Sequence, residues 1–230
     1  MRPGTLYGVS VGPGDPELLT LKAVCILQSA HVIATPGTTR EPGIAYGIAQ
    51  EYVAGKPLLP CPMPMTRDQA KLESARLEAA NAICGQLSQG KDVAYLCLGD
   101  ISIYSSYSYL EEIVRNRGFQ TCAVPGIPSF CAAAAELRVP LCQGDEILQV
   151  VPGPSVSHIN LPNESTNLVI LKAGSSLHDT RDALRGCGRL DSSYAIERCG
   201  FPNQRIIDLK TDEVGAGYLT LVISRPSRVP

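Results

Sequence analysis

Residues 6–23 read LYGVSVGPGDPELLTLKA and place an apolar strand, a glycine-rich turn and the start of a helix in one short span. Gly12 and Gly14 can adopt positive φ and carry no Cβ, so a ligand can approach the main chain closely there. Pro13 fixes one φ between them and removes one N–H. The turn is therefore shaped in advance, and it presents backbone rather than side chains to a ligand.

The residues after the turn favour a helix. Asp15 is a good N-cap and Pro16 suits the first helical position, so we expect a helix that begins there and runs to about Ser29. A dinucleotide fingerprint requires a third glycine where this chain has Glu17, and a P-loop requires a Gly-Lys-Ser/Thr sequence that does not follow. A ligand-binding turn and a purely structural tight turn remain as alternatives.

The composition limits the class of protein. The chain has 230 residues, enough for one large domain or two small ones, with a formal net charge of −2 and a pI near 5.9. A general nucleic-acid binder usually carries a basic face, so this charge balance argues against one. No apolar segment follows a basic N-terminus and no apolar run approaches the ~18 residues that span a bilayer, so we expect a cytoplasmic protein without a membrane partner.

Cysteine and histidine are poorly placed for a metal site. The nine cysteines are an odd number without a C-x-x-C pair, and His31, His158 and His178 are far apart in the sequence. We therefore expect no metal bound by the protein itself and expect most cysteines to be small buried hydrophobic residues.

Apolar strands alternate with helical segments in the first half of the chain. The strand expected at 92–98 is almost wholly apolar, which indicates a parallel sheet covered by helices on both faces. Thr66 and Gln69 form a capping box for a helix that Gly90 ends. Residues 57–65 carry four prolines and predict an ordered, non-helical loop. The other strands expected here are 5–11, 31–34 and 120–124, and a further helix is expected over 103–116.

The second half has a more mixed pattern, and the break at Pro125-Gly126 predicts two α/β domains, 1–125 and 126–230. We expect helices at 129–137 and 176–186, and strands at 148–151, 168–172, 193–197 and 218–224.

Three glycine-containing loops follow three of the expected strands in the first half. They contain residues 12–15, 99–100 and 125–127. Because the carboxyl ends of parallel strands lie at one edge of a sheet, the three loops meet in the crevice where such folds bind ligands.

These loops, together with Leu18-Leu19-Thr20, resemble the tetrapyrrole methylase family. The segments YSSYSYL at 104–110 and PMPMTRD at 62–68 further resemble the C20-methyltransferases of corrin biosynthesis, which act on precorrin-2 or its cobalt form. The resemblance implies an α/β fold of two domains, with a parallel sheet in the N-terminal one, a mixed sheet in the C-terminal one and a trough between them. It also implies S-adenosylmethionine as methyl donor and a homodimer.

The resemblance also implies a set of cofactor contacts. Lys172 occupies a position where relatives often have Met, and Cys199 and Thr220 match positions near the adenosyl group. The complete set is Pro13, Leu98, Gly99, Asp100, Ile103, Ser129, Phe130, Lys172, Cys199 and Thr220.

A tetrapyrrole of this pathway carries many carboxylates, so Arg or Lys side chains are expected to bind them. Arg40 and Arg67, on loops, are as compatible with substrate binding as with a solvated surface, whereas a solvated surface is the better interpretation of Lys71 and Arg115. Tyr104, just after a glycine turn, is a third expected substrate contact. His158, on a polar loop, is a weaker candidate ligand for cobalt that arrives within the substrate.

The expected chemistry needs few side chains. Methyl transfer from a sulfonium requires alignment and exclusion of water, and the chain shows no nucleophile–base pair of the hydrolase type. We assign no general base. Another tetrapyrrole methylase, an RNA or protein methylase of the same fold, and a non-catalytic tetrapyrrole-binding protein remain as alternatives, and the sequence leaves open whether the substrate contains cobalt.

Overall fold

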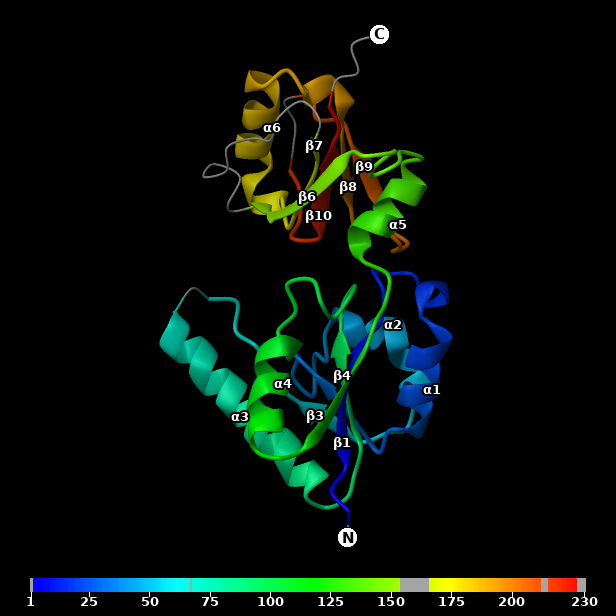
Figure 1. Ribbon diagram of the computed structural model, residues 1–230, viewed down its shortest axis with the longest axis vertical. Helices are drawn as coiled ribbons and strands as arrows, with labels where there is room; N and C mark the ends of the chain where they lie inside the picture. The colour runs from blue at the N-terminus through cyan, green and yellow to red at the C-terminus, as the bar shows by residue number, and fades with distance from the viewer. Residues whose placement is uncertain (1, 67, 154–165, 212–214, 227–230) are drawn as a thin grey trace. The chain divides into compact units, whose positions relative to one another are not determined.

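The computed structural model of the chain describes residues 2–66, 68–153, 166–211 and 215–226 (Figure 1). The chain forms two compact units, Met1–Pro128 and Ser129–Pro230. Each has its own five-stranded sheet. The division into domains at residue 125 stays a prediction.

The first unit is built on a wholly parallel sheet with the strand order β3-β2-β4-β1-β5. Figure 1 shows helices α1 and α2 on one face of this sheet and α3 and α4 on the other, which confirms the predicted parallel sheet covered by helices. The strands are β1 (Thr5–Ser10), β2 (Val32–Thr35), β3 (Leu58–Pro60), β4 (Val93–Cys97) and β5 (Gln120–Val124), and the helices are α1 (Leu21–Ser29), α2 (Ile44–Val53), α3 (Gln69–Leu87) and α4 (Tyr107–Asn116).

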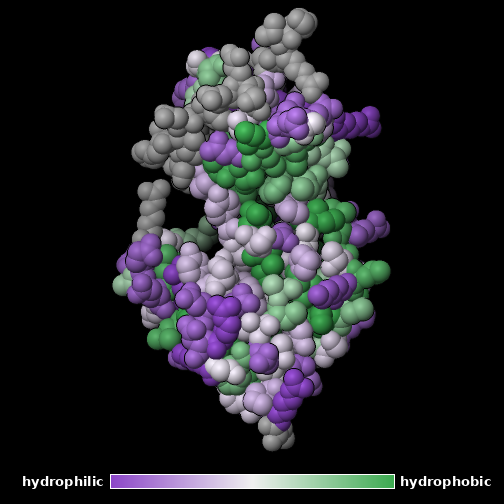
Figure 2. All heavy atoms as spheres, viewed as in Figure 1, coloured by the Kyte–Doolittle hydropathy of each residue, from purple (hydrophilic) through white to green (hydrophobic). Residues whose placement is uncertain are grey.

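The core of the first unit lies on both faces of β4, all five residues of which are buried. Tyr95 and Tyr107 are its largest side chains, and burial raises the pKa of both hydroxyls above their usual range. A Cβ at Gly8 of β1 would overlap Ile101 and would lie 2.5 Å from Cζ of Tyr107, so a residue without a side chain is required there. Figure 2 shows that the outer surface over α3 and α4 is largely hydrophilic, as expected for helices with one solvated face.

The glycine turn differs in one respect from the expectation. Pro16–Leu18 form a short 3₁₀ turn, in which Oδ1 of Asp15 accepts from the N–H of Glu17. Leu19 is then extended, and helix α1 begins only at Leu21, with the Thr20 hydroxyl accepting from Ala23 N–H. The predicted continuous helix from Pro16 is therefore wrong, because Thr20 is a second N-cap that restarts the helix.

Two further helix starts lie later than predicted. The N-cap of α3 is Asp68, which accepts from Lys71 N–H, while the Thr66 hydroxyl accepts from Asp68 N–H, so the capping box of Thr66 and Gln69 does not form. Helix α4 begins at Tyr107 rather than Ile103, because Tyr104 has φ 49°, a left-handed backbone that no helix contains. Helix α2 and strand β3 were not predicted, and β3 lies within the proline-rich segment expected to be a loop.

The second unit contains a mixed sheet with the strand order β6-β7-β10-β8-β9. Strand β6 pairs with β7 in parallel, and the other pairs are antiparallel, which confirms the predicted mixed sheet. Figure 1 shows α6 and α5 on opposite sides of this sheet, and Leu177 and Leu184 of α6 pack into its core. The strands are β6 (Ile147–Pro152), β7 (Thr166–Leu171), β8 (Ser193–Glu197), β9 (Arg205–Ile207) and β10 (Thr220–Ser224), and the helices are α5 (Ser129–Glu136) and α6 (Leu177–Gly186).

The cysteines are less buried than expected. All nine are free thiols, and burial raises the pKa of Cys61 and Cys97 to about 12. The expectation that most are buried is wrong, because only Cys61, Cys84, Cys97 and Cys199 are buried. Within the described part of the chain, no helix combines the length and the hydropathy needed to cross a membrane.

Gly8→Ala tests the close packing of β1. Its Cβ would overlap Ile101 and crowd Tyr107, so we expect a loss of about 1–3 kcal/mol in the free energy of unfolding. Urea unfolding measures it. Gly47→Ala is the matched control, because Gly47 lies within α2 and a Cβ there meets no atom within 4 Å. The control should gain about 0.5–1 kcal/mol. Equal midpoints for Gly8→Ala and the wild type would contradict this account of the core.

Candidate functional site

The loops that follow β1 and β4 meet at the carboxyl edge of the first sheet. Gly12 and Gly99 exchange two backbone hydrogen bonds, with N–O distances of 3.2 and 2.7 Å, and form an antiparallel bridge beyond the ends of two parallel strands. Their φ values are 76° and 73°. Both positions therefore require the left-handed backbone that glycine adopts without strain. The structure confirms that these two glycine loops lie side by side.

The Asp100 carboxylate ties the loop after β4 to the loop after β5. Its Oδ2 accepts from Gly126 N–H at 2.7 Å. Its Oδ1 accepts from Ser102 N–H at 2.8 Å and also from the Ser102 hydroxyl. The side chain is 8% exposed, so the carboxylate lies among donors rather than in bulk water. Asp100 thus connects the second and third loops of the site.

Ser10 makes the corresponding link from β1. Its buried hydroxyl accepts from Ile101 N–H at 2.8 Å. A Cβ at Gly126 would lie 2.5 Å from Cβ of Ser10 and 3.0 Å from the carbonyl oxygen of Gly99, so the third loop packs directly on the first two. The three loops therefore form one hydrogen-bonded cluster, which we call the loop junction and which contains Ser10, Gly12, Gly99, Asp100 and Gly126.

The electrostatics of the loop junction favour an ionised Asp100. Burial by itself raises the pKa of this carboxyl, but the hydrogen bonds from Gly126 and Ser102 outweigh burial, and the net pKa lies below the usual value. A carboxylate that accepts three hydrogen bonds and has a lowered pKa is a poor general base. Asp100 is therefore placed to hold the loops.

Beyond the junction, the loops offer backbone and apolar side chains. Leu98 and Ile103 are half-buried, and Pro13 is buried. Ile103 N–H donates to the carbonyl oxygen of Asp100 at 3.2 Å, which closes the turn after β4. Tyr104 follows with φ 49° and is 53% exposed. A non-glycine residue in the left-handed region costs energy and occurs preferentially at binding sites, which supports a role for Tyr104.

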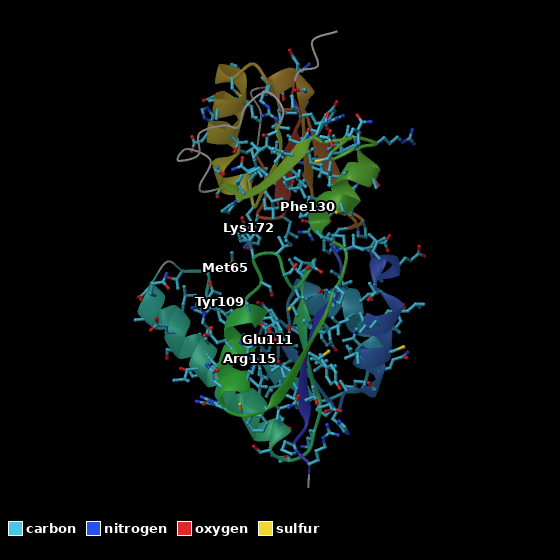
Figure 3. The ribbon with its side chains drawn as sticks, viewed as in Figure 1. Met65, Tyr109, Glu111, Arg115, Phe130 and Lys172 are labelled. Atoms are coloured by element: carbon cyan, nitrogen blue, oxygen red, sulfur yellow. The ribbon has the colours of Figure 1, made fainter. Side chains whose placement is uncertain are left out.

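The described basic residues that were expected to bind substrate lie on three different segments of the first unit. Arg40 is exposed in the loop between β2 and α2, and Lys71 pairs with Asp68 at 3.5 Å on the first turn of α3. Arg115 is exposed in the last turn of α4, where Figure 3 shows it on the same helix as Tyr109. Arg67 and His158 lie outside the described residues.

The remaining expected cofactor contacts belong to the second unit. Ser129 and the buried Phe130 begin helix α5 (Figure 3). Lys172 is exposed just after β7, Cys199 is buried just after β8, and Thr220 is the buried first residue of β10. Because β10 runs antiparallel to both β7 and β8, these last three residues lie at one edge of the second sheet.

Sequence reasoning missed two residues of these edges. Ser10 was treated as part of an apolar strand, although a lone polar residue at the end of such a strand is the signal of a buried hydrogen bond. Arg198 has no predicted role from the sequence, yet its φ of 54° is one of four positive values among the described non-glycine residues. His31 is structural, because its Nδ1 accepts from Asp92 N–H at 3.0 Å.

Among the described residues, no group of three or more His, Cys, Asp or Glu side chains is placed to hold a metal ion.

The sequence matches the family model described as Tetrapyrrole (Corrin/Porphyrin) Methylases over residues 5–215. A relative from Mycobacterium tuberculosis (strain ATCC 25618 / H37Rv), named Cobalamin biosynthesis protein CobIJ, is 34% identical over 232 residues. The alignment covers 96% of this chain and 46% of the relative, so the chain spans less than half the length of that protein.

Two shorter relatives are matched over nearly their whole length. The Precorrin-2 C(20)-methyltransferase of Sinorhizobium sp is 33% identical, with 96% of this chain and 94% of the relative covered. The protein named Probable cobalt-precorrin-2 C(20)-methyltransferase in Methanocaldococcus jannaschii is 32% identical, with 95% and 94% covered.

A solved structure supports the fold. The uroporphyrin-III C-methyl transferase of Thermus thermophilus, described as complexed with S-adenyl homocysteine, superimposes with a TM-score of 0.69 at 21% identity, covering 96% of this chain and 97% of that one. At this identity the likeness concerns the fold alone, and it confirms the expected fold class.

Asp100→Asn tests the loop junction. The amide would place an NH₂ group against at least one of the donors that Asp100 now accepts from, so we expect a loss of about 2–3 kcal/mol in stability at neutral pH. The folded-state pKa is lowered, so the wild-type advantage is complete above the unfolded-state pKa of about 4 and is lost as the pH falls through the folded-state value.

Urea unfolding of both proteins between pH 7 and pH 3 measures this difference. The exposed residue Asp145 provides the matched control, because Asp145→Asn removes the same charge away from the loop junction. A constant difference between Asp100→Asn and the wild type across this pH range would show that the Asp100 charge is not what holds the loops.

Proposed function

The chain belongs to the tetrapyrrole (corrin/porphyrin) methylase family, and we propose that it transfers a methyl group from S-adenosylmethionine to C20 of precorrin-2 or of its cobalt form in cobalamin biosynthesis. The observation that carries the proposal is the match to two C20-methyltransferases, each 32–33% identical and each 94% covered by this chain. The first relative, of which this chain spans 46%, bears a cobalamin biosynthesis name that is consistent with the same pathway.

The residues at the loop junction fit such a donor. The polar groups of the junction are satisfied by one another through Ser10, Asp100 and the paired glycines. The groups that remain available to a ligand are the main chain of the loops and the apolar side chains of Leu98 and Ile103. The adenine ring of the donor is flat with a few polar edges, so a surface of apolar side chains and main chain suits it. We propose Pro13, Leu98, Gly99, Asp100 and Ile103 as its contacts in the first unit, with Asp100 contributing through its backbone.

The same donor contacts are proposed in the second unit from the resemblance. Ser129 and Phe130 begin α5, and Lys172, Cys199 and Thr220 share one edge of the second sheet. The buried thiol of Cys199 has its pKa raised to about 11 by burial, so it is neutral at physiological pH. A neutral thiol is a packing group beside a ligand, which fits a cofactor contact better than a nucleophile.

Methyl transfer requires the protein to position the donor and the substrate more than it requires proton transfer by a side chain. The bound donor would supply an electrophilic methyl group, and the meso carbon of a reduced tetrapyrrole would supply the electron pair of the new C–C bond. The methyl–sulfur bond would break to leave neutral S-adenosylhomocysteine, and the C20 proton would then be lost to water or to a substrate carboxylate. The loop junction holds its backbone rigidly through Asp100, and rigid placement of a ligand is the largest contribution that a protein makes to such a displacement. Apolar walls at Leu98 and Ile103 exclude water from one side.

The substrate side of the proposal involves exposed groups of the first unit. Arg40 is proposed to bind a peripheral carboxylate, as is Arg67, which lies outside the described residues. Tyr104, strained and exposed, is proposed to contact the macrocycle. Cobalt enters only as part of the substrate, and we further propose a cytoplasmic homodimer, as the family resemblance implies.

Anaerobic incubation with labelled S-adenosylmethionine tests the proposal. Precorrin-2 and cobalt-factor II are offered in parallel, and we expect one methyl group on one of them, located at C20 by NMR of the labelled carbon. The preferred substrate identifies the metal-free or the cobalt-containing route.

A methyl group at another ring position would replace the C20 assignment with another tetrapyrrole methylase. Binding of a tetrapyrrole without transfer would favour a non-catalytic binding protein. Binding of S-adenosylhomocysteine, measured calorimetrically on the same preparation, serves as the control for an intact donor site.

A further inference from the structure

The edge of the second sheet that contains Thr220 also carries two basic residues whose backbone has a positive φ. Lys172 follows β7 with φ 56°, and Arg198 follows β8 with φ 54°. Ala173 N–H donates to the carbonyl oxygen of Thr220 at 2.8 Å, and Arg198 N–H donates to that of Leu219 at 2.9 Å. The two basic residues therefore flank the same short segment at the start of β10.

The positive φ values of Lys172 and Arg198 are not explained by the end of a helix. Arg138 also has φ 56°, but it follows α5, where it and Val139 donate to carbonyl oxygens of the last helical turn, as at many helix ends. Lys172 and Arg198 instead follow strands. A non-glycine residue held in this region costs energy, and such strain gathers at ligand-binding sites.

Both cations are held by aromatic rings. Nζ of Lys172 lies 5.6 Å from the ring centre of Tyr218, and Cζ of Arg198 lies 5.2 Å from that of Phe201. Arg198 Nε donates to Oδ1 of Asn203 at 2.7 Å. These partners orient the cations without neutralising them.

Carboxylates pair with other cations of the second unit but not with these two. Arg205 pairs with Glu197 at 2.7 Å, Lys210 with Asp191 at 2.9 Å, and Arg225 with Glu146 at 3.3 Å. In the part of the chain that the structure describes, neither Lys172 nor Arg198 forms an ion pair. Among the described residues, no ion pair compensates these two positive charges, in a chain whose net charge is −2.

We propose that Lys172 and Arg198 bind peripheral carboxylates of the tetrapyrrole, an assignment that rests on the proposed function and names residues that recognise its substrate. Strands β7 and β8 are separated only by β10, which places the two backbones roughly 10 Å apart. Long side chains at that spacing reach two carboxylates on one macrocycle. The donor contact proposed for Lys172 is made by its backbone, which Lys172→Met leaves in place, and its ammonium group binds the substrate.

The methionine portion of the donor is the other source of a carboxylate. It carries an ammonium and a sulfonium beside that carboxylate, so its net charge is positive and it does not compensate two further positive charges. A polycarboxylate macrocycle does. The spacing and the charge count favour the tetrapyrrole.

Lys172→Met and Arg198→Met, singly and together, test the proposal. Each keeps an unbranched apolar stem and removes one charge. We expect each single change to raise the KM for the tetrapyrrole about 10-fold and the double change to raise it at least 50-fold, with the Kd for S-adenosylhomocysteine within 2-fold of wild type. The KM of the wild type should also rise with salt concentration, and that rise should flatten in the double variant.

Arg138→Met is the matched control, because Arg138 is an exposed arginine of the same unit with the same sign of φ but lies after α5. It should leave both constants unchanged, and thermal unfolding of every variant checks the fold. An unchanged KM for the tetrapyrrole in the double variant overturns the proposal. A selective loss of S-adenosylhomocysteine binding overturns it as well, because it would assign the cations to the donor.

A second measurement separates this inference from the proposed function. Fluorescence titration with uroporphyrin, a polycarboxylate tetrapyrrole, measures binding without methyl transfer. Weaker binding by the double variant supports the cation pair even if wild-type protein fails to methylate C20. Equal binding by wild type and double variant, with C20 methylation intact in both, refutes the pair and leaves the proposed function standing.

Discussion

The Asp100 carboxylate is the constraint on which the candidate site depends. Parallel strands end in separate loops, and nothing in the sheet itself joins the loops of β4 and β5. Asp100 joins them through Gly126 N–H, and Ser10 joins β1 to the same loop through Ile101 N–H. The paired glycines 12 and 99 complete the connection. A charged acceptor is suited to this position because hydrogen bonds to an ionised group are stronger than those between neutral groups.

This arrangement explains why the site shows so little acid–base machinery. The Asp100 carboxylate already accepts hydrogen bonds from Gly126 N–H and from the N–H and hydroxyl of Ser102. The buried thiols Cys61 and Cys97 have pKa values near 12, so they remain neutral. A site of this kind offers shape and rigidity to its ligands. The two sheet edges differ in chemistry, because the edge of the second sheet carries the cations Lys172 and Arg198, which form no ion pair with a described residue.

The elements with strong patterns could be predicted from the sequence. The apolar strand β4 indicated a parallel sheet, and the segments around β5, α5 and β8 were placed within a residue of their observed ends. Glycine loops at the carboxyl ends of strands also indicated that these loops meet at one edge of the first sheet. The mixed second sheet was expected from the family resemblance, and the pattern of its segments alone predicted only a second α/β domain.

What could not be predicted depended on competition between neighbouring residues. Thr20 and Asp68 displaced the expected N-caps because a second good cap stood a few residues further on. Strand β9 is three residues long and carries too little pattern to recognise. The role of Ser10 arises from a contact with Ile101, 91 residues further along the chain, and that of Asp100 from a contact with Gly126, 26 residues further along. Local sequence encodes neither contact. The left-handed backbone at Lys172 and Arg198 likewise has no signal in the local sequence, because neither residue is a glycine.

A crystal structure of the full chain with S-adenosylhomocysteine tests the central claim most directly. The account predicts that the ligand lies against the backbone of Gly12–Asp15 and Leu98–Ile103, with the hydrogen bonds of Asp100 to Gly126 and Ser102 intact. A ligand bound elsewhere on the chain, or an Asp100 carboxylate that leaves Gly126 to bind the ligand directly, would contradict it.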